Sequence, residues 1–343
     1  MDKVFKYELF NKMIRDFAVN EVKPLAHEVD EQERFPYETV EKMAKLGLMG
    51  IIVPKEYGGM GGDYKMYIKA VEELSKVCAT TGVILSAHTS LCIAPIMEYG
   101  NEEQKKKYLP KLASGEWLGA FGLTEPNAGT DANNQTTTAV KEGDHWVLNG
   151  SKIFITNAGP ANVYFVIAVT GRNPKGVECA AFIVEKGFPG FSVGKKELKM
   201  GIRGSSTCEL IFENCIVPEA NLVGKIGEGV KMALKTLDGG RVGISAQALG
   251  IAEGALEATV AYVKERKQFN KPISAFQNTQ FCLADLYTKI NAASLLVERA
   301  TEAKQNKSPM LGMYAAQAKL FAAETAMEVT TKCVQLHGGY GYT

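Results

Sequence analysis

Cysteine and histidine are the residues here that could ligate a metal, form disulfides or supply a nucleophile and its base. The four histidines are not at metal-ligand spacing, so we expect no metal site. His145 stands beside a predicted strand and is better explained as a solvated edge residue than as a catalytic base, which needs a positioned partner. The seven cysteines form no C-x-x-C pair and are widely spaced, which is typical of reduced, mostly buried thiols: Cys78, Cys92, Cys179, Cys208, Cys215, Cys282 and Cys333.

Glycine is in excess, at 34 of 343 residues, where an average protein has about 7%. Glycine-rich loops can cradle phosphates, yet the sequence has no G-x-G-x-x-G after a predicted strand and no G-x-x-x-x-G-K-[ST]. It also has no G-x-S-x-G nucleophile elbow. The cluster at Tyr57–Asp63 is predicted to be a surface loop.

Asp238 and Arg241 are charged residues three positions apart on a predicted helix, so their side chains share a face. From the residues alone, an ion pair on a solvated helix is the better explanation of this pair.

The elements that must position these residues fall into three stretches. Tyr7 to about Gly119 has helical periodicity, with Pro24 predicted to kink or end the first helix and Pro36 to start the next. Two further helices are predicted in this stretch, the second apolar almost all round and therefore in a core: Tyr64–Cys78 and Gly82–Tyr99.

The middle stretch, from about Ala120 to Val223, has the pattern of short strands. Trp146–Leu148 and Lys152–Thr156 flank Asn149-Gly150, which predicts a β-hairpin. The other predicted strands suggest a small sandwich or barrel: Val163–Val169, Cys179–Glu185 and Glu209–Phe212.

The last stretch predicts three long helices: Gly229–Phe269, Phe276–Gln305 and Pro309–Leu336. Pro272 blocks continuation of the first, and Pro309 suits the first turn of the third. Short connections indicate antiparallel neighbours in a bundle. We therefore predict an α+β fold with an all-helical domain at 1–119, a β domain at 120–226 and a C-terminal helical bundle at 227–343.

Composition excludes several classes of protein. Lys plus Arg number 39 and Asp plus Glu 38, so no broad basic surface exists to neutralise nucleic-acid phosphates. The apolar runs are too short to span a bilayer, and we expect no membrane insertion. Together with the widely spaced cysteines, this favours a cytoplasmic protein.

Six segments, in order, resemble the acyl-CoA dehydrogenase family, and the resemblance extends from about Tyr7 to Thr343. Within that family the chain is most similar to the short-chain and bacterial butyryl-CoA dehydrogenases. The segments are Phe121–Asp131 (FGLTEPNAGTD), Lys152–Asn157 (KIFITN), Gly201–Thr207 (GIRGSST), Leu237–Arg241 (LDGGR), Glu265–Phe269 (ERKQF) and Gln335–Tyr342 (QLHGGYGY).

The resemblance implies non-covalent FAD between the β domain and the bundle. It also implies a homotetramer in which one site, made by Arg266, Gln277 and Gln335 through Gly339, binds the FAD pyrophosphate and adenine of a neighbouring subunit. Thr124 would bond the flavin's polar edge, Phe154 would stand where relatives often have tryptophan, and Thr130 would contact the FAD pyrophosphate or the CoA. Asp238 and Arg241 would bind the CoA adenine and ribose. The implied FAD residues are Phe121, Leu123, Thr124, Thr130, Phe154, Ile155, Thr156, Arg266, Gln277, Gln335, Gly338 and Gly339.

The resemblance implies α,β-dehydrogenation of a short-chain acyl-CoA, with electrons passed to an electron-transfer flavoprotein, or the reverse enoyl-CoA reduction. The α-proton requires a carboxylate base. Relatives place this glutamate after the segment matching Gln335–Tyr342, or before the arginine matching Arg241, where this chain has Gly240. We therefore expect the base beyond Thr343 and the bundle to be incomplete in this chain.

Two other functions stay open. A chain that ended at Thr343 would be a catalytically silent protein that binds FAD and acyl-CoA, and a third possibility is an oxidase that reduces oxygen directly. Acyl length and branching, redox direction and the identity of the electron acceptor are open as well.

Overall fold

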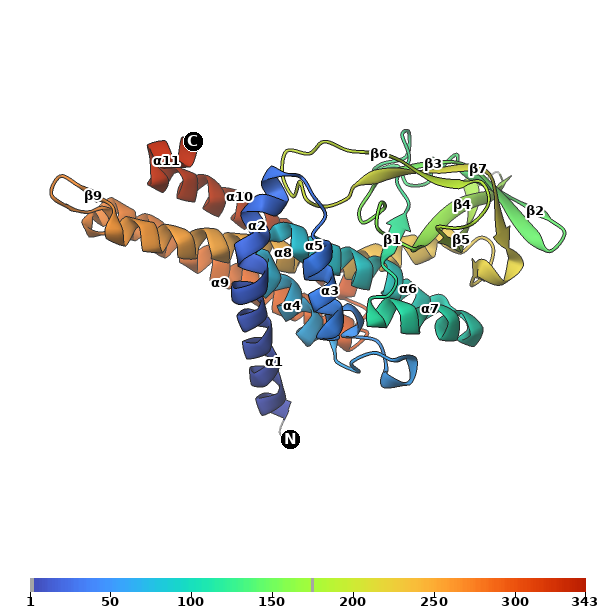
Figure 1. Cartoon of the computed structure of the whole chain (residues 1–343), viewed down its shortest axis with the longest axis horizontal. Coiled ribbons are helices and arrows are strands. Elements are labelled where there is room, and N and C mark those ends of the chain that lie inside the picture. Colours follow the sequence, from blue (N-terminus) through green and yellow to red (C-terminus); the bar gives the residue numbers. More distant parts are fainter. Residues whose placement is uncertain (1–2, 174–175) are drawn as a thin grey trace. The chain divides into compact units, whose positions relative to one another are not determined.

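The computed structural model describes residues 3–173 and 176–343 and has an α+β fold, with helices at both ends of the chain and strands in the middle (Figure 1). The observed α+β class confirms the fold class predicted from the sequence. The residues cluster into two compact units, each drawn from separate stretches of the chain. One comprises Met1–Ala26, Tyr64–Val83 and Arg241–Thr343, and the other comprises His27–Asp63 and Ile84–Gly240.

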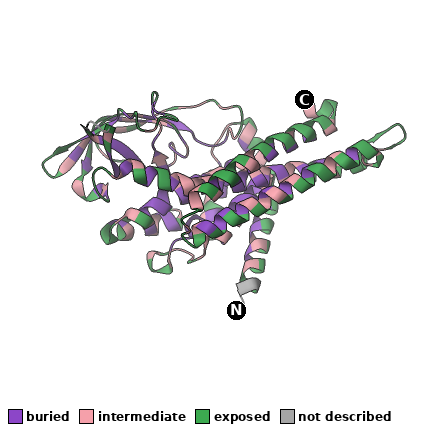
Figure 2. Ribbon diagram, turned by 180° about the vertical axis from the view of Figure 1, so that it is seen from behind, coloured by how far each residue is buried: buried purple, intermediate pink, exposed green. Residues whose placement is uncertain are grey.

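The first unit, called the helical unit below, is built from long helices whose buried stripes are rich in alanine and branched residues. Figure 2 shows buried and exposed residues alternating along these helices. Ala246, Ile290, Ala318 and Val329 lie on the buried stripes. The helices are α1 (Lys3–Phe17), η1 (Ala18–Val22), α2 (Lys23–Glu31, as far as Ala26), α4 (Tyr64–Val77), α5 (Ala79–Ala87, as far as Val83), α8 (Gly229–Glu265, from Arg241 on), η6 (Ile273–Ala275), α9 (Gln277–Gln305), α10 (Leu311–His337) and α11 (Gly339–Tyr342).

The predicted ends of two of these helices are wrong. Helix α8 ends at Glu265, not at Phe269, because the chain turns into a small hairpin of β9 (Lys267–Gln268) and β10 (Lys271–Pro272). Phe269 and Asn270 form its turn with φ of 53° and 60°, a conformation that no α-helix can continue. Pro309 lies in the turn before α10, not in its first turn.

The second unit, called the β unit below, combines short helices with a sheet. Pro24 lies in the part of α2 that belongs to the helical unit, and it does not end the first helical stretch: the π-helical η1 directly precedes α2, so the irregular turn falls just before the proline. The helices of the β unit are α2 (Lys23–Glu31, from His27 on), α3 (Tyr37–Lys45), η2 (Leu48–Gly50), η3 (Lys55–Tyr57), α5 (Ala79–Ala87, from Ile84 on), η4 (His88–Ile93), α6 (Ala94–Tyr99), α7 (Glu102–Ser114), η5 (Glu219–Asn221) and α8 as far as Gly240.

Contrary to the expectation that every apolar run is too short, one helical stretch, Ala79–Tyr99, is long and apolar enough to cross a membrane, but 78% of its apolar 18-residue window is buried inside the structure. This burial is that of a core helix, as its apolar sequence predicts.

The sheet has eight strands in the order β6-β7-β3-β2-β4-β5-β8, with β1 paired to β4 in parallel. Its core packs Trp146 edge-on against Phe182, with ring centroids 5.4 Å apart. The strands are β1 (Gly119–Gly122), β2 (Thr138–Glu142), β3 (His145–Ile155), β4 (Val163–Asn173), β5 (Gly176–Glu185), β6 (Phe191–Lys196), β7 (Cys208–Pro218) and β8 (Leu222–Val223).

The hairpin predicted at Asn149-Gly150 is wrong, because β3 runs straight through this step. Gly150 has φ +135° and causes a register shift against β7 between Leu148 and Gly150. Glycine in a strand interior often marks such a bulge. The hairpin turn lies earlier, where Glu142 pairs with His145 across Gly143-Asp144.

Candidate functional site

The first predicted cofactor residues lie at the end of β1. The ring of Phe121 stacks on Phe165 with centroids 6.2 Å apart. Leu123 is buried and Thr124 half-buried, and the Thr124 carbonyl accepts a hydrogen bond of 2.8 Å from the Ile153 N–H. The end of β1 is therefore tied directly to β3.

The second group of predicted residues is at the end of β3. A register shift against β7 falls between Lys152 and Ile155, and Phe154 has φ 58°, a conformation that is strained for a bulky residue. The Phe154 side chain is 59% exposed, while Ile155 is buried and Thr156 half-buried. The irregular backbone thus presents an aromatic ring to the surface beside a threonine hydroxyl.

Two hydroxyl groups of these segments have free hydrogen-bonding capacity. Among residues 3–173 and 176–343, no hydrogen bond engages the hydroxyl of Thr124 or of Thr156. A Cβ added to Gly129 would meet no atom within 4 Å, and Thr130 is exposed. These groups can bind an external polar molecule without breaking an internal contact.

A buried ion pair supports this region, and the sequence analysis missed it. Lys152 and Glu125 have side chains 0% and 1% exposed, with Nζ and Oε1 2.6 Å apart. Burial lowers the pKa of Lys152 to about 8, against the attraction of the Glu125 carboxylate. Burial also disfavours ionised Glu125, but Lys152 and hydrogen bonds from Thr136 and Thr137 outweigh it and hold the pKa of Glu125 below its ordinary value. Both groups are therefore charged at neutral pH.

The start of β1 is held by the imidazole of His88, which is fully buried. Its Nδ1 accepts a hydrogen bond from the Gly119 N–H at 3.0 Å, and its Nε2 lies 3.1 Å from the Leu112 carbonyl. These partners assign the neutral ring with its proton on Nε2. Burial lowers the pKa of His88 to about 4.

The predicted substrate residues Asp238 and Arg241 both lie in α8 and are half-buried, and both already make contacts within the protein. Gly240 lies between them. A Cβ there would come 2.9 Å from Leu91 Cδ2, so the side chain of Leu91 covers the place where a base would project.

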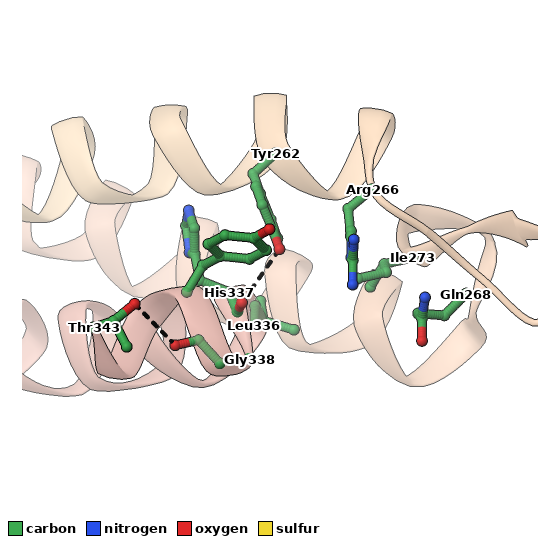
Figure 3. Close-up of a pocket in the computed structure, with 10 residues that line it drawn as sticks. Tyr262, Arg266, Gln268, Ile273, Leu336, His337, Gly338 and Thr343 are labelled. Carbon is green, nitrogen blue, oxygen red and sulfur yellow. Dashed lines mark hydrogen bonds between the residues drawn. The ribbon is translucent and has the colours of Figure 1, made fainter.

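A separate cavity of about 530 Å³ lies in the helical unit, where α10 ends (Figure 3). It brings together Arg266, Gly338 and Gly339, as predicted for one site. Gly338 has φ 62° and ψ −133°, a combination that suits glycine. Neither Gly338 nor Gly339 has an atom within 4 Å of an added Cβ, so bare backbone faces open space.

Two other residues predicted for this site, Gln277 and Gln335, are exposed and do not line the cavity. The structure adds lining residues that the sequence analysis missed, namely Tyr262, Gln268, Ile273, Tyr340 and Thr343. Tyr262 could have been found from its spacing, since it precedes Arg266 by one helical turn. Its ring stacks on His337 at 4.3 Å, and its hydroxyl donates a 3.2 Å hydrogen bond to the His337 carbonyl.

Among the residues that the structure describes, no group of three or more His, Cys, Asp or Glu side chains is arranged to hold a metal ion.

Comparison with protein-family models gives three matches. Residues 6–116 match the acyl-CoA dehydrogenase N-terminal domain, residues 120–215 the middle domain and residues 227–343 the C-terminal domain.

Two relatives are similar over nearly the whole chain. The short-chain specific acyl-CoA dehydrogenase of Clostridium acetobutylicum is 60% identical over 98% of this chain and 88% of its own length. The acryloyl-CoA reductase (NADH) of Anaerotignum propionicum is 50% identical over 98% of this chain and 85% of its own length.

Solved structures agree with these matches. Butyryl-CoA dehydrogenase of Megasphaera elsdenii is 49% identical and superposes with a TM-score of 0.95 over 98% of this chain and 88% of that one. A chain in a structure of the electron transferring flavoprotein of Acidaminococcus fermentans has 54% identity, the same TM-score and the same coverage. An acyl-CoA dehydrogenase of Bacillus anthracis complexed with FAD has 36% identity and a TM-score of 0.89, over 98% of this chain and 61% of that one.

Proposed function

Because this chain belongs to the acyl-CoA dehydrogenase family, we propose that it carries out the α,β-dehydrogenation of a short-chain, butyryl-CoA-like substrate to the trans-2-enoyl-CoA. It is an FAD-dependent oxidoreductase, as its family is. The observation that carries the proposal for the site is the hydrogen bond between the Thr124 carbonyl and the Ile153 N–H at 2.8 Å, which joins the two segments predicted to bind the flavin ring.

The residues of these segments fit a flavin. The hydroxyls of Thr124 and Thr156 are without partners among the described residues, and a flavin ring has a polar edge that accepts and donates hydrogen bonds. Phe154 offers an exposed aromatic face, and Leu123 and Ile155 offer apolar surface. When bound, FAD supplies the acceptor for the hydride from the β-carbon; the chain's residues bind and orient it.

We further propose that Thr130, Asp238 and Arg241 bind the CoA moiety, with Thr130 placed also to contact the FAD pyrophosphate. Arg266 offers a planar, permanently charged group suited to a pyrophosphate, and the open backbone at Gly338 and Gly339 allows close approach. We propose that five residues bind the FAD of a neighbouring subunit in a homotetramer: Arg266, Gly338, Gly339, Gln277 and Gln335.

The general base is not assigned to a residue of this sequence. Gly240 has no side chain, and Leu91 covers its Cα.

The proposed electron acceptor is an electron-transfer flavoprotein, supported by the similarity to a chain solved with such a protein. Reduction of an enoyl-CoA is the second physiological direction that we propose, and the acryloyl-CoA reductase relative favours it. The proposed location is the cytoplasm, with domain boundaries at 119/120 and 226/227.

The test is turnover of an acyl-CoA series by the full-length protein with a dye as electron acceptor. We expect bound FAD that butyryl-CoA bleaches, with activity falling as the acyl chain lengthens. A full-length protein that binds no flavin would overturn the proposal. Bound FAD that no acyl-CoA reduces would indicate the silent binding protein, and oxygen consumption without added acceptor would indicate an oxidase.

A further inference from the structure

The buried Lys152–Glu125 pair has more hydrogen bonds to backbone and loop groups than a simple ion pair needs. The Lys152 ammonium donates to Glu125 Oε1 at 2.6 Å, to Gln135 Oε1 at 2.9 Å and to the Leu123 carbonyl at 3.1 Å. All three donors of the ammonium are therefore used, and one of them is fixed on the backbone next to Thr124.

The carboxylate of Glu125 is bound as fully as the ammonium. It accepts from the Thr136 N–H at 2.6 Å, the Thr136 hydroxyl at 2.8 Å and the Thr137 N–H at 3.1 Å. The pair thus joins the segment after β1, the residues just before β2 and the strand β3 through hydrogen bonds with defined directions.

The position of the pair in the chain links it to both segments proposed to face the flavin. Glu125 directly follows Leu123-Thr124, and Lys152 precedes Phe154 by two residues on β3. The lysine stem passes beside the backbone of Gly122, since a Cβ added there would lie in ordinary van der Waals contact with Lys152 Cγ, at 3.5 Å. The ammonium therefore reaches one segment from the strand that carries the other.

Stability alone does not explain such a pair, because a buried ion pair is often no more stable than apolar residues of the same volume. An apolar pair would fill this space but would leave the Leu123 carbonyl without its hydrogen bond. What the charges add is a fixed backbone position.

We propose that Lys152 and Glu125 are positioning residues of the flavin site, which hold Leu123-Thr124 in register with Phe154–Thr156 and so set the affinity and the electronic environment of the bound ring. This inference rests on the proposed function. The residues do not touch the substrate, and they act through the backbone of the residues that bind the cofactor.

The test compares Lys152→Met, Glu125→Gln and the double variant with the parent protein. FAD affinity, the visible absorption spectrum of bound flavin and the denaturation midpoint are measured, with amide hydrogen exchange at Leu123 and Ile153 in the cofactor-free protein. Lys186→Met is the matched control, because Lys186 also donates to a backbone carbonyl, that of Gly159 at 2.7 Å, but from an exposed position.

We expect Lys152→Met to weaken FAD binding at least tenfold, shift the flavin spectrum and speed exchange of the Ile153 amide, while the control changes none of these. The double variant has no uncompensated charge, so its denaturation midpoint recovers toward that of the parent while its FAD affinity and spectrum do not. Glu125→Gln keeps the side-chain shape and gives the same readouts should Lys152→Met fail to fold.

The inference is overturned if FAD affinity recovers with stability in the double variant, or if the single variants bind FAD as the parent does. A parent protein that binds no FAD would instead refute the proposed function.

Discussion

The β unit buries one lysine against one glutamate, whereas the helical unit holds a larger network of lysines and glutamates between α4 and α8. Lys152 and Glu125 have essentially no exposed surface. In the helical unit, Lys69 and Lys76 keep 27% and 15% of their side-chain surface exposed, and Lys76 Nζ lies 2.8 Å from a carboxylate oxygen of Glu253. The two regions thus place similar charges in different surroundings.

The difference follows from what the backbone leaves unpaired. In a helix each carbonyl is already bonded within the helix, so the charges of α4 and α8 pair with one another. Beside β1 the chain is irregular, and the Leu123 carbonyl takes a bond from Lys152. Buried charge in the β unit therefore fixes the position of a backbone segment, whereas in the helical unit it links α4 to α8.

The balance of charge differs as well. The pair in the β unit consists of one cation, Lys152, and one anion, Glu125. In the helical unit, burial and then the neighbouring Glu72 carboxylate raise the pKa of Glu253, although Lys76 and Lys69 oppose this. The helical network therefore contains a carboxylate that is not fully compensated.

The largest expected effect is that of Lys152→Met. It leaves the Glu125 carboxylate buried without its cation, and we expect a loss of about 3–5 kcal/mol in the free energy of unfolding. Lys69→Met, at a partly exposed position with other cations nearby, should cost about 1 kcal/mol or less. Urea unfolding measures both, and equal losses would remove the distinction between the two regions.

Acid should weaken the β unit through His88. Its pKa is about 4 in the folded protein and about 6.5 in the unfolded chain, so between these values the unfolded state binds more protons. The stabilisation is complete above pH 6.5 and falls by about 1.4 kcal/mol per pH unit below it. Urea unfolding at pH 7 and pH 5 tests this against His88→Gln, and an equal pH response of parent and variant would contradict it.

The close approach of α4 and α8 in the helical unit depends on two glycines. A Cβ on Gly250 would lie 2.3 Å from the Glu72 carbonyl oxygen, and one on Gly254 would lie 2.1 Å from the Lys76 carbonyl oxygen. Either alanine variant should lose about 1–3 kcal/mol through overpacking, measured by thermal unfolding. The control is Gly201→Ala, where no atom lies within 4 Å of the added Cβ; a similar loss there would show that packing is not the cause.

The smallest effect is expected for Glu253→Gln. The raised pKa of Glu253 means that the folded state binds more protons than the unfolded state above pH 4.5, so its ionisation costs stability as pH rises. The amide variant should be slightly more stable than the parent at pH 7, and this gain should shrink toward pH 5. Glu257→Gln, with a side chain 71% exposed, is the control in the same urea titrations, and a gain independent of pH would contradict the explanation.

Much of the fold was predictable because it depends on local pattern. Helical periodicity gave the helices of both ends, and the change to short β-rich runs gave the position of the sheet. The errors were at glycine and proline. Asn149-Gly150 has the composition of a hairpin turn, but strand β7 pairs on both sides of it, which makes it a bulge. Pro272 marks the end of a hairpin strand, not the end of α8.

The sequence by itself determined the α+β order of elements, the family and the segments Phe121–Asp131 and Lys152–Asn157, because motif and periodicity are properties of neighbouring residues. Only the tertiary structure decided that Lys152 and Glu125 are buried together. Lysine and glutamate are normally exposed, and these two are 27 positions apart, so no local pattern distinguishes them from surface charges. Their burial follows from the tertiary fold: β3 does not pair with β1, but the hydrogen bond from the Ile153 N–H to the Thr124 carbonyl holds β3 beside the residues that follow β1, where the Leu123 carbonyl accepts from the ammonium.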